Sequence, residues 1–348
     1  MRLRLNSTEQ ILAAARALEQ GALVGFPTET VYGLGADAEN INAVANIYKA
    51  KGRPSNHPVI VHLAPEADIS YWVKEIPAPA QALIDAFWPG PLTLILKRAE
   101  HIPDAVSGGQ DSIGIRCPSH PVAQALLRAF KDGKGGVAAP SANKFGHVSP
   151  TKAEHVIEEF PAEIANGMIA AVLDGGQSDV GIESTIVDMS RLATHGPVLL
   201  RPGHITALQL EQVLGMAVNA PDQAAPRASG TLEAHYAPST PVAMVAVAEL
   251  ESVISRLLSA GKRVAVMAYQ PHISNAQLQA WRQLNNDPIS YAHDLYADLR
   301  ELDHVQADII LVEALPSTRD WQGVADRLRR AAFDSQGVLQ TLLSDSVA

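Results

Sequence analysis

Short apolar segments of strand length alternate with amphipathic helical segments along almost the whole 348-residue chain, and this alternation restricts the fold more than any other feature. It predicts an α/β protein. The expected strands of the first part are residues 22–26, 59–63, 92–96, 112–116, 136–139, 170–173, 185–189 and 198–200. The expected helices include 40–50, 79–87 and 121–130, one that follows a capping box at Ser7 and Gln10, and one that follows a capping box at Thr151 and Glu154.

Between Gly215 and Pro241 the alternation stops, and prolines stand among Ala, Ser and Gly without sustained periodicity. We therefore expect a first domain at residues 1–214, a linker at 215–240 and a C-terminal domain at 241–348. In the C-terminal domain, the expected strands 241–247, 263–268 and 307–312 alternate with helices 250–260, 290–302 and 323–332. This order predicts a small, Rossmann-like parallel sheet.

Composition excludes several classes of protein. Lys and Arg number 27 against 37 Asp and Glu, and the net charge of -10 argues against a surface built mainly to hold nucleic-acid phosphates. Cys117 is the single cysteine, which excludes an intrachain disulfide and a multi-thiolate zinc site and favours the cytoplasm. The first residues lack a signal-peptide pattern, and the apolar run 242–248 is far shorter than the roughly 18 residues of a membrane span.

The familiar nucleotide and hydrolase motifs are missing from the sequence. Gly133-Lys134 lacks the earlier glycine of a P-loop, and Gly33-Leu34-Gly35 is not followed by the third glycine of a dinucleotide site. There is no HExxH, no Cys/His ligand pair and no GxSxG. The chemistry must therefore come from other segments.

Residues 26–36 follow a buried strand and hold two threonines, a carboxylate, a tyrosine and two glycines. Such a loop can donate several hydrogen bonds to a ligand, and its glycines permit close approach of the backbone. A polar turn with a capping threonine explains the same composition. Both interpretations stay open on the residues alone.

Three cations stand at positions that suit anions. Lys51 and Arg53 follow the predicted helix 40–50, where they can bind a polyanion such as a triphosphate or simply complement the helix dipole. Arg116 shares a strand face with Ser112 and Gly114, which predicts either a carboxylate pocket or an arginine that points outward from a half-exposed strand.

Hydroxyls, an amide and one more cation stand in four later segments, as Ser141, Asn143, Ser149, Ser184 and Arg201. Ser149 precedes a predicted helix N-terminus, which is a natural site for phosphate oxygens. Together these segments describe a cavity rich in hydroxyls and cations without an activated nucleophile. His62 on its buried strand is by itself typical of a satisfied core histidine, and Cys117 is interpreted as a core filler.

In this order the segments resemble the threonylcarbamoyl-AMP synthase family, whose YrdC-type domain carries PTETVYGLG, a KxR pair, WPGPLT and an SxN pair. Here they stand at residues 27–35, 51–53, 88–93 and 141–143. The run 181–188 also matches, and the similarity spans residues 8–207. The HYAP tetrapeptide at 235–238 and the C-terminal α/β domain resemble the longer, two-domain form of the family.

The resemblance implies a twisted mixed sheet with helices in the first domain, and an enzyme. L-threonine, bicarbonate or CO2, and ATP would give threonylcarbamoyl-AMP and pyrophosphate, by nucleotidyl transfer at the α-phosphate of ATP. A downstream transfer complex would use the product to modify an adenosine beside the tRNA anticodon. Mg2+ would bind mainly through the ATP phosphates. Neither chemical step needs an enzyme nucleophile, so catalysis would rest on positioning and charge neutralisation.

The resemblance also implies the site residues. The expected threonine pocket uses Thr30, Tyr32, His62, Arg116, the backbone at Ala139, and Ser184. The expected nucleotide side uses Lys51, Arg53, His57, Ser112, Ser141, Asn143, Ser149, Arg201 and Tyr236. Lys51 and Arg53 are the expected catalytic residues, and Tyr236 is expected to close over the site as part of a mobile lid. Residues 231–234, which are Thr-Leu-Glu-Ala here, depart from the basic residues of the family pattern.

Two other functions compete with this interpretation. A noncatalytic RNA-binding module of the YrdC type is one, although the charge of -10 and the lack of basic runs weigh against it. A carbamoyl transferase related to hydrogenase maturation is the other, but the sequence lacks the zinc-finger and acylphosphatase regions of that family. Pyrophosphate release that depends on threonine and not on RNA separates the first alternative from the enzyme.

Overall fold

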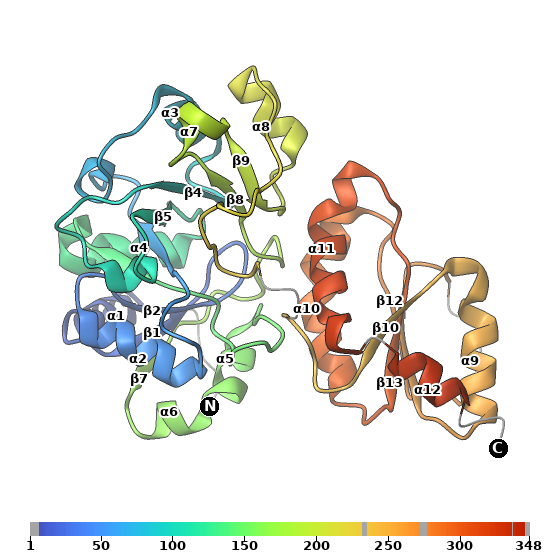
Figure 1. The fold of residues 1–348 in the computed structure, drawn as a ribbon. Helices are drawn as coiled ribbons and strands as arrows, with labels where there is room; N and C mark the ends of the chain where they lie inside the picture. The colour runs from blue at the N-terminus through green and yellow to red at the C-terminus, as the bar shows by residue number, and fades with distance from the viewer. Residues whose placement is uncertain (1–6, 232–234, 272–276, 336, 345–348) are drawn as a thin grey trace. The chain divides into compact units, whose positions relative to one another are not determined.

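The computed structural model describes residues 7–231, 235–271, 277–335 and 337–344. The chain divides into two compact units (Figure 1). The first unit comprises Met1–Phe145 and Ser149–Thr231, and the second comprises Gly146–Val148 and Leu232–Ala348. Each unit has its own sheet, and each is described here by itself.

A nine-stranded mixed sheet is the frame of the first unit, with strand order β7-β1-β2-β6-β3-β5-β4-β8-β9. The strands are β1 (Leu23–Phe26), β2 (Gly33–Asp37), β3 (Ile60–Leu63), β4 (Leu92–Lys97), β5 (Ser112–Arg116), β6 (Gly136–Ala138), β7 (Ile169–Val172), β8 (Thr185–Asp188) and β9 (Val198–Arg201). The pairs β3/β5 and β4/β8 are parallel, whereas β4/β5 and β8/β9 are antiparallel. The expected mixed sheet is confirmed.

The helices of this unit are α1 (Thr8–Glu19), α2 (Ile41–Lys51), α3 (Ala78–Phe87), α4 (Pro121–Ala129), α5 (Ala153–Glu159), α6 (Pro161–Ala165), α7 (Leu192–His195) and α8 (Ala207–Leu214). The capping box at Ser7 and Gln10 is confirmed. The capping box predicted at Thr151 is wrong, because α5 begins at Ala153 and no side chain caps it. The backbone N–H of Thr151 donates to Nδ1 of His155 instead, at 3.2 Å.

The segment 26–36, predicted as one loop, contains the strand β2, which pairs antiparallel with β1. Gly35 explains why this strand has no apolar alternation in the sequence. A Cβ atom at Gly35 would lie 2.9 Å from both the Phe26 ring and a Val137 methyl, so the strand needs glycine in order to pack.

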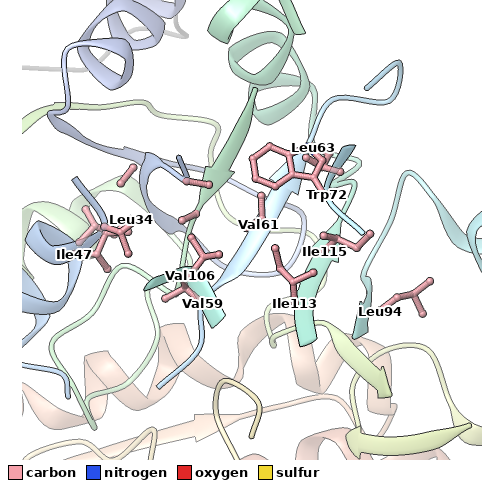
Figure 2. Close-up of a cluster of buried hydrophobic side chains, with 14 of the residues drawn as sticks. Leu34, Ile47, Val59, Val61, Leu63, Trp72, Leu94, Val106, Ile113 and Ile115 are labelled. Atoms are coloured by element: carbon pink, nitrogen blue, oxygen red, sulfur yellow. The ribbon is translucent and has the colours of Figure 1, made fainter. Parts of the chain in front are cut away.

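The main core of the first unit lies on one face of the sheet. Figure 2 shows Val61 and Leu63 of β3 together with Ile113 and Ile115 of β5 in this cluster. Side chains alternate along a strand, so Ser112, Gly114 and Arg116 belong to the opposite face of β5. On that second face a smaller buried cluster unites Ile60, Ile95, Ile186, Val198, Leu200 and Ala228.

Residues 215–231, predicted as part of the linker, pack on the first unit. The amide of Leu199 in β9 donates to the carbonyl of Asn219 at 2.9 Å. Arg191 forms an ion pair with Asp222 at 2.9 Å, and the backbone N–H of Arg227 donates to Gln110 at 2.7 Å. We call residues 215–231 the strap. The predicted linker residues 232–234 lie outside the described residues.

The second unit has a parallel sheet with strand order β10-β13-β11-β12. Its elements are β10 (Val242–Val245), α9 (Leu250–Ser259), β11 (Val264–Ala268), β12 (Ala280–Gln283), α10 (Pro288–Asp303), β13 (Ile309–Glu313), α11 (Gln322–Ala331) and α12 (Val338–Ser344). Helices α10 and α11 cover one face, and α9 and α12 cover the other (Figure 1). The parallel sheet is confirmed, with β12 as an additional strand that the sequence pattern did not indicate.

The length of the helices decides whether one of them could span a membrane. The longest helix in the described part of the chain, α10, has 16 residues, and no helix there is long and apolar enough to span a bilayer.

Candidate active site

Arg116 is a buried cation on the second face of the first sheet. Its Nε donates to the carbonyl of Gly90 at 3.3 Å, and Nη1 donates to Oγ1 of Thr30 at 2.9 Å. Its Nη2 lies 2.7 Å from a carboxylate oxygen of Glu29. The arginine is 4% exposed, so it is not the outward arginine of a half-exposed strand. Thr30 and Arg116, both predicted for the threonine pocket, lie together.

Glu29 is a site residue that the sequence analysis did not assign. The sequence showed a carboxylate in the segment 26–36, but Arg116 lies 87 positions later in the chain. Only the fold brings the two side chains together, because the β1–β2 connection meets the end of β5. The PTET sequence was the available signal, since it places a charged residue three positions after the end of a buried strand.

His62 stands beside Arg116 in the register of β3 and β5. Burial, together with the positive charge of Arg116, lowers the pKa of the imidazole to about 3. His62 is therefore neutral at pH 7. Its ring meets the Phe26 ring edge to face, with centroids 6.1 Å apart. A neutral imidazole can donate a hydrogen bond to a ligand hydroxyl through one ring nitrogen or accept one through the other. A charged imidazolium can only donate.

Ser184 links the Arg116 region to Arg201. Its hydroxyl lies 2.8 Å from Oγ1 of Thr93 and accepts from Nη2 of Arg201 at 3.1 Å. Nε of Arg201 donates to the Ser184 carbonyl at 3.0 Å, and Nη1 donates to the carbonyl of Ser229 in the strap at 2.8 Å. Arg201 is 2% exposed.

Lys51 is buried at the end of α2, where it does more than complement a helix dipole. Gly52 ends the helix with a left-handed backbone conformation, and the Lys51 side chain turns inward. Nζ donates to the carbonyls of Ser141, at 2.6 Å, and Asn143. Burial, followed by the charge of Arg53, holds the pKa of Lys51 well below its usual range. The predicted pair Ser141 and Asn143 is thus in contact with a predicted catalytic residue.

Arg53 lies close to the strap. Its Nη2 donates to the carbonyl of Pro58 at 2.9 Å and to the hydroxyl of Ser229 at 3.5 Å. His57 packs edge to face on Phe145, and burial lowers its pKa. Two cations predicted to hold phosphates, Arg53 and Arg201, therefore share Ser229 as a partner.

Ser149 is buried, and its hydroxyl donates to Oε1 of Glu183 at 2.5 Å. Glu183 is a second carboxylate that the sequence analysis left unassigned within the run 181–188. Ser149 lies four residues before α5, whose first residue is Ala153, so it does not stand directly before that helix. The structure thus gives Ser149 a carboxylate as its partner.

Ser112 opens onto a cavity of about 690 Å³ that Lys97, Asp111, Arg191 and Ala225 also line. Its volume lies within the roughly 300–1,000 Å³ of small-molecule sites. Ser112 is itself buried at the start of β5.

Tyr32, Ala139 and Cys117 have structural partners. The Tyr32 hydroxyl donates to the Gly176 carbonyl at 2.7 Å and accepts the Gly175 N–H at 3.0 Å, and burial raises its pKa. The backbone N–H of Ala139 donates to the Ile60 carbonyl at 2.9 Å. Burial raises the pKa of Cys117 to about 12, which agrees with its interpretation as a core filler.

Tyr236 belongs to the second unit, where its φ of 64° is unusual for a tyrosine. Its ring centroid lies 5.7 Å from that of Tyr296, and the Arg327 guanidinium lies 5.5 Å from its centroid. Its predicted contact with nucleotide stays a prediction.

The part of the chain that the structure describes has no group of three or more His, Cys, Asp or Glu side chains able to hold a metal ion. Hard cations such as Mg2+ commonly keep several waters and bind through one or two carboxylates and substrate phosphates. Binding of Mg2+ through the ATP phosphates stays a prediction.

The site therefore unites four buried cations, Lys51, Arg53, Arg116 and Arg201, with hydroxyls from separate segments of the first unit. Such a surface can bind a carboxylate at Arg116 and phosphates at Lys51, Arg53 and Arg201.

Comparisons with known proteins agree along the length of the chain. A family model described as telomere recombination matches residues 16–203, and one described as the C-terminal domain of threonylcarbamoyl-AMP synthase matches residues 205–333. The threonylcarbamoyl-AMP synthase of Pyrococcus abyssi is 37% identical over 334 residues, which cover 93% of this chain and 94% of that protein. The Bacillus subtilis protein of the same name is 38% identical over 334 residues, with 93% of each chain covered.

A solved structure is similar to both units. The crystal structure of Pyrococcus abyssi Sua5, in complex with L-threonine, superposes with a TM-score of 0.84 at 35% sequence identity. The match covers 95% of this chain and 96% of the other.

Proposed function

Because the chain belongs to the threonylcarbamoyl-AMP synthase family, we propose that it is an enzyme that makes threonylcarbamoyl-AMP and pyrophosphate from L-threonine, bicarbonate or CO2, and ATP. The product would pass to a downstream complex that modifies an adenosine of tRNA. The single cysteine supports our expectation that it works in the cytoplasm.

One observation carries this proposal. Arg116 is buried on the second face of the sheet with Thr30 at 2.9 Å, and the buried cations Arg53 and Arg201 share Ser229 as a partner elsewhere in the first unit. A buried guanidinium with a fixed orientation suits a carboxylate, and a hydroxyl beside it suits a hydroxy amino acid. The similar Pyrococcus abyssi protein was crystallised with L-threonine.

The proposed reaction requires only side chains that bind and orient its substrates. The α-amine of threonine adds to CO2, which forms an N–C bond and releases a proton. An oxygen of the resulting carbamate then attacks the α-phosphorus of ATP, and pyrophosphate leaves. Both bonds form between substrates, so the protein must hold them in line and stabilise the developing charge on the phosphate.

The proposed threonine pocket comprises Thr30, Tyr32, His62, Arg116, Ser184 and the backbone at Ala139. The proposed nucleotide residues are Lys51, Arg53, His57, Ser112, Ser141, Asn143, Ser149, Arg201 and Tyr236. Mg2+ would neutralise phosphate charge when it is bound. Lys51 already donates to two carbonyls, which leaves part of its ammonium for a phosphate oxygen.

Pyrophosphate release from ATP tests the proposal directly. We expect release that requires L-threonine and bicarbonate and does not require RNA. The control is the same assay with free L-alanine as the substrate in place of L-threonine, because L-alanine lacks the hydroxyl. Binding of RNA with no turnover would instead support a noncatalytic RNA-binding module.

A further inference from the structure

Glu29 is a buried carboxylate beside the proposed threonine pocket, and its role is not explained by any substrate contact assigned above. Its side chain is 5% exposed, and its backbone carbonyl accepts the Val180 N–H at 2.7 Å. The carboxylate therefore sits on a fixed loop, close to the site and away from water.

The partners of this carboxylate are unusual. Buried carboxylates normally accept several well-aligned hydrogen bonds. Both oxygens of Glu29 are buried without an aligned donor among the described residues. Its partner is the Nη2 atom of Arg116, 2.7 Å from Oε1, which balances its charge.

Arg116 is in turn held by groups from different segments. The Thr30 hydroxyl accepts from Nη1 and the Gly90 carbonyl accepts from Nε. The Glu29 carboxylate faces Nη2. A guanidinium has five N–H donors, so these three contacts leave others for a ligand. The contacts also fix the plane in which the remaining donors point.

The pairing has a consequence for selectivity. A lone buried arginine attracts any carboxylate and favours a ligand of net negative charge. A neutral Arg–Glu pair favours a ligand that carries both signs of charge, as a free amino acid does. The oxygens of Glu29 are closed off from solvent, so the residue acts through Arg116 and through its electric field.

We propose that Glu29 is a positioning residue that fixes Arg116 and balances its charge, so that the site selects a zwitterionic amino acid over a simple hydroxy acid. This inference rests on the proposed function, because it takes the Arg116 pocket as the amino-acid site. It adds a source of selectivity that acts before any chemistry on the amine.

The test compares L-threonine with (R)-3-hydroxybutyrate, which keeps the carboxylate and the hydroxyl but lacks the amine. Affinities are measured for the full chain by ligand-observed NMR, without ATP. The wild type should prefer threonine. Glu29→Gln keeps the shape and removes the charge, so we expect the preference to fall by about 10-fold or more, with hydroxybutyrate binding unchanged or tighter.

Asp37→Asn is the matched control. Asp37 is also a buried carboxylate, paired with Lys131 at 2.8 Å, but it lies outside the proposed pocket. We expect it to leave the preference unchanged. An equal loss of both ligands in Glu29→Gln, or an unchanged preference, would overturn the proposal and leave Glu29 a structural role.

Glu29→Asp covers the case in which the neutral variant does not fold. It keeps the negative charge, so its preference for threonine should stay within about 3-fold of the wild type even if both ligands bind more weakly. A fall of more than about 10-fold in Glu29→Asp would overturn the charge argument. If the wild type itself neither binds threonine nor releases pyrophosphate, the proposed function fails as well; if only the Glu29 variants disagree, the proposed function stands.

Discussion

Nζ of Lys51 donates to the carbonyl oxygen of Ser141 at 2.6 Å, and this contact joins the end of α2 to the segment that follows β6. The Asn143 carbonyl accepts from the same ammonium. Lys51 therefore connects two motifs that lie 90 positions apart in the sequence. Its ammonium lies in a buried place that disfavours the charged form. Such a residue can shape the proposed phosphate site as well as neutralise a phosphate.

Lys51→Met should lower kcat for pyrophosphate release by roughly 100-fold or more, because one preorganised positive group is lost from the transition state. Steady-state release of pyrophosphate measures this. Lys134→Met, which removes an exposed lysine outside the site, is the control and should keep the wild-type rate. A Lys51→Met enzyme with unchanged kcat would restore the helix-dipole interpretation.

Arg116→Ala should raise the KM for threonine by roughly 10- to 100-fold, and the KM for ATP much less, because a charge-assisted hydrogen bond to the amino acid is lost. The change also leaves the Glu29 charge buried and unpaired, so about 3–5 kcal/mol of stability should be lost. Substrate titrations measure the first effect and urea unfolding the second. Equal increases in both KM values would show that Arg116 does not act in the threonine pocket.

The elements that the sequence predicted well are those whose side chains carry the pattern. The strand 112–116 has the predicted bounds because its apolar residues alternate with Ser112, Gly114 and Arg116. Strand β2 was missed because its glycines pack closely without side chains that could show a period. A local pattern also failed at Thr151, whose amide bonds to His155 and whose position lies before the helix.

The candidate site was predictable as a set of residue types but not as a set of contacts. Hydroxyls and cations can be recognised from the sequence, and the motifs order them along the chain. Their pairing depends on which strand ends meet, as with Glu29 and Arg116. The same reason explains why the position of Ser229 between Arg53 and Arg201 had no local signal.

His62 should make the protein less stable in mild acid. Its pKa is about 3 in the folded protein and near 6.5 when unfolded, so below pH 6.5 the unfolded chain binds the extra proton. This residue should therefore remove about 1.4 kcal/mol of unfolding free energy per pH unit between pH 6.5 and 3. Urea unfolding at pH 7 and pH 5 measures the slope.

His62→Gln should show a smaller loss of stability between pH 7 and pH 5 than the wild type, because glutamine does not titrate there. The other acidic and histidine groups contribute to both proteins and cancel in the difference. Identical slopes would mean that the folded protein accepts a proton on His62 without a penalty.

The strap should tighten when substrates bind. In the ligand-free chain, polar contacts hold it, such as Arg227 to Gln110 at 2.7 Å and the Ser229 carbonyl to Arg201 at 2.8 Å. Contacts of this kind open at modest free energy, and phosphates that bind Arg53 and Arg201 would rearrange them. We therefore expect amide hydrogen exchange in residues 227–231 and 235–238 to slow when ATP and threonine are both present, because closure would keep water from a labile intermediate. Mass spectrometry of exchange measures this, with strand β11 as the internal control that should not change. If exchange in these residues is the same with saturating substrates, the segment is a tether and the lid prediction is wrong.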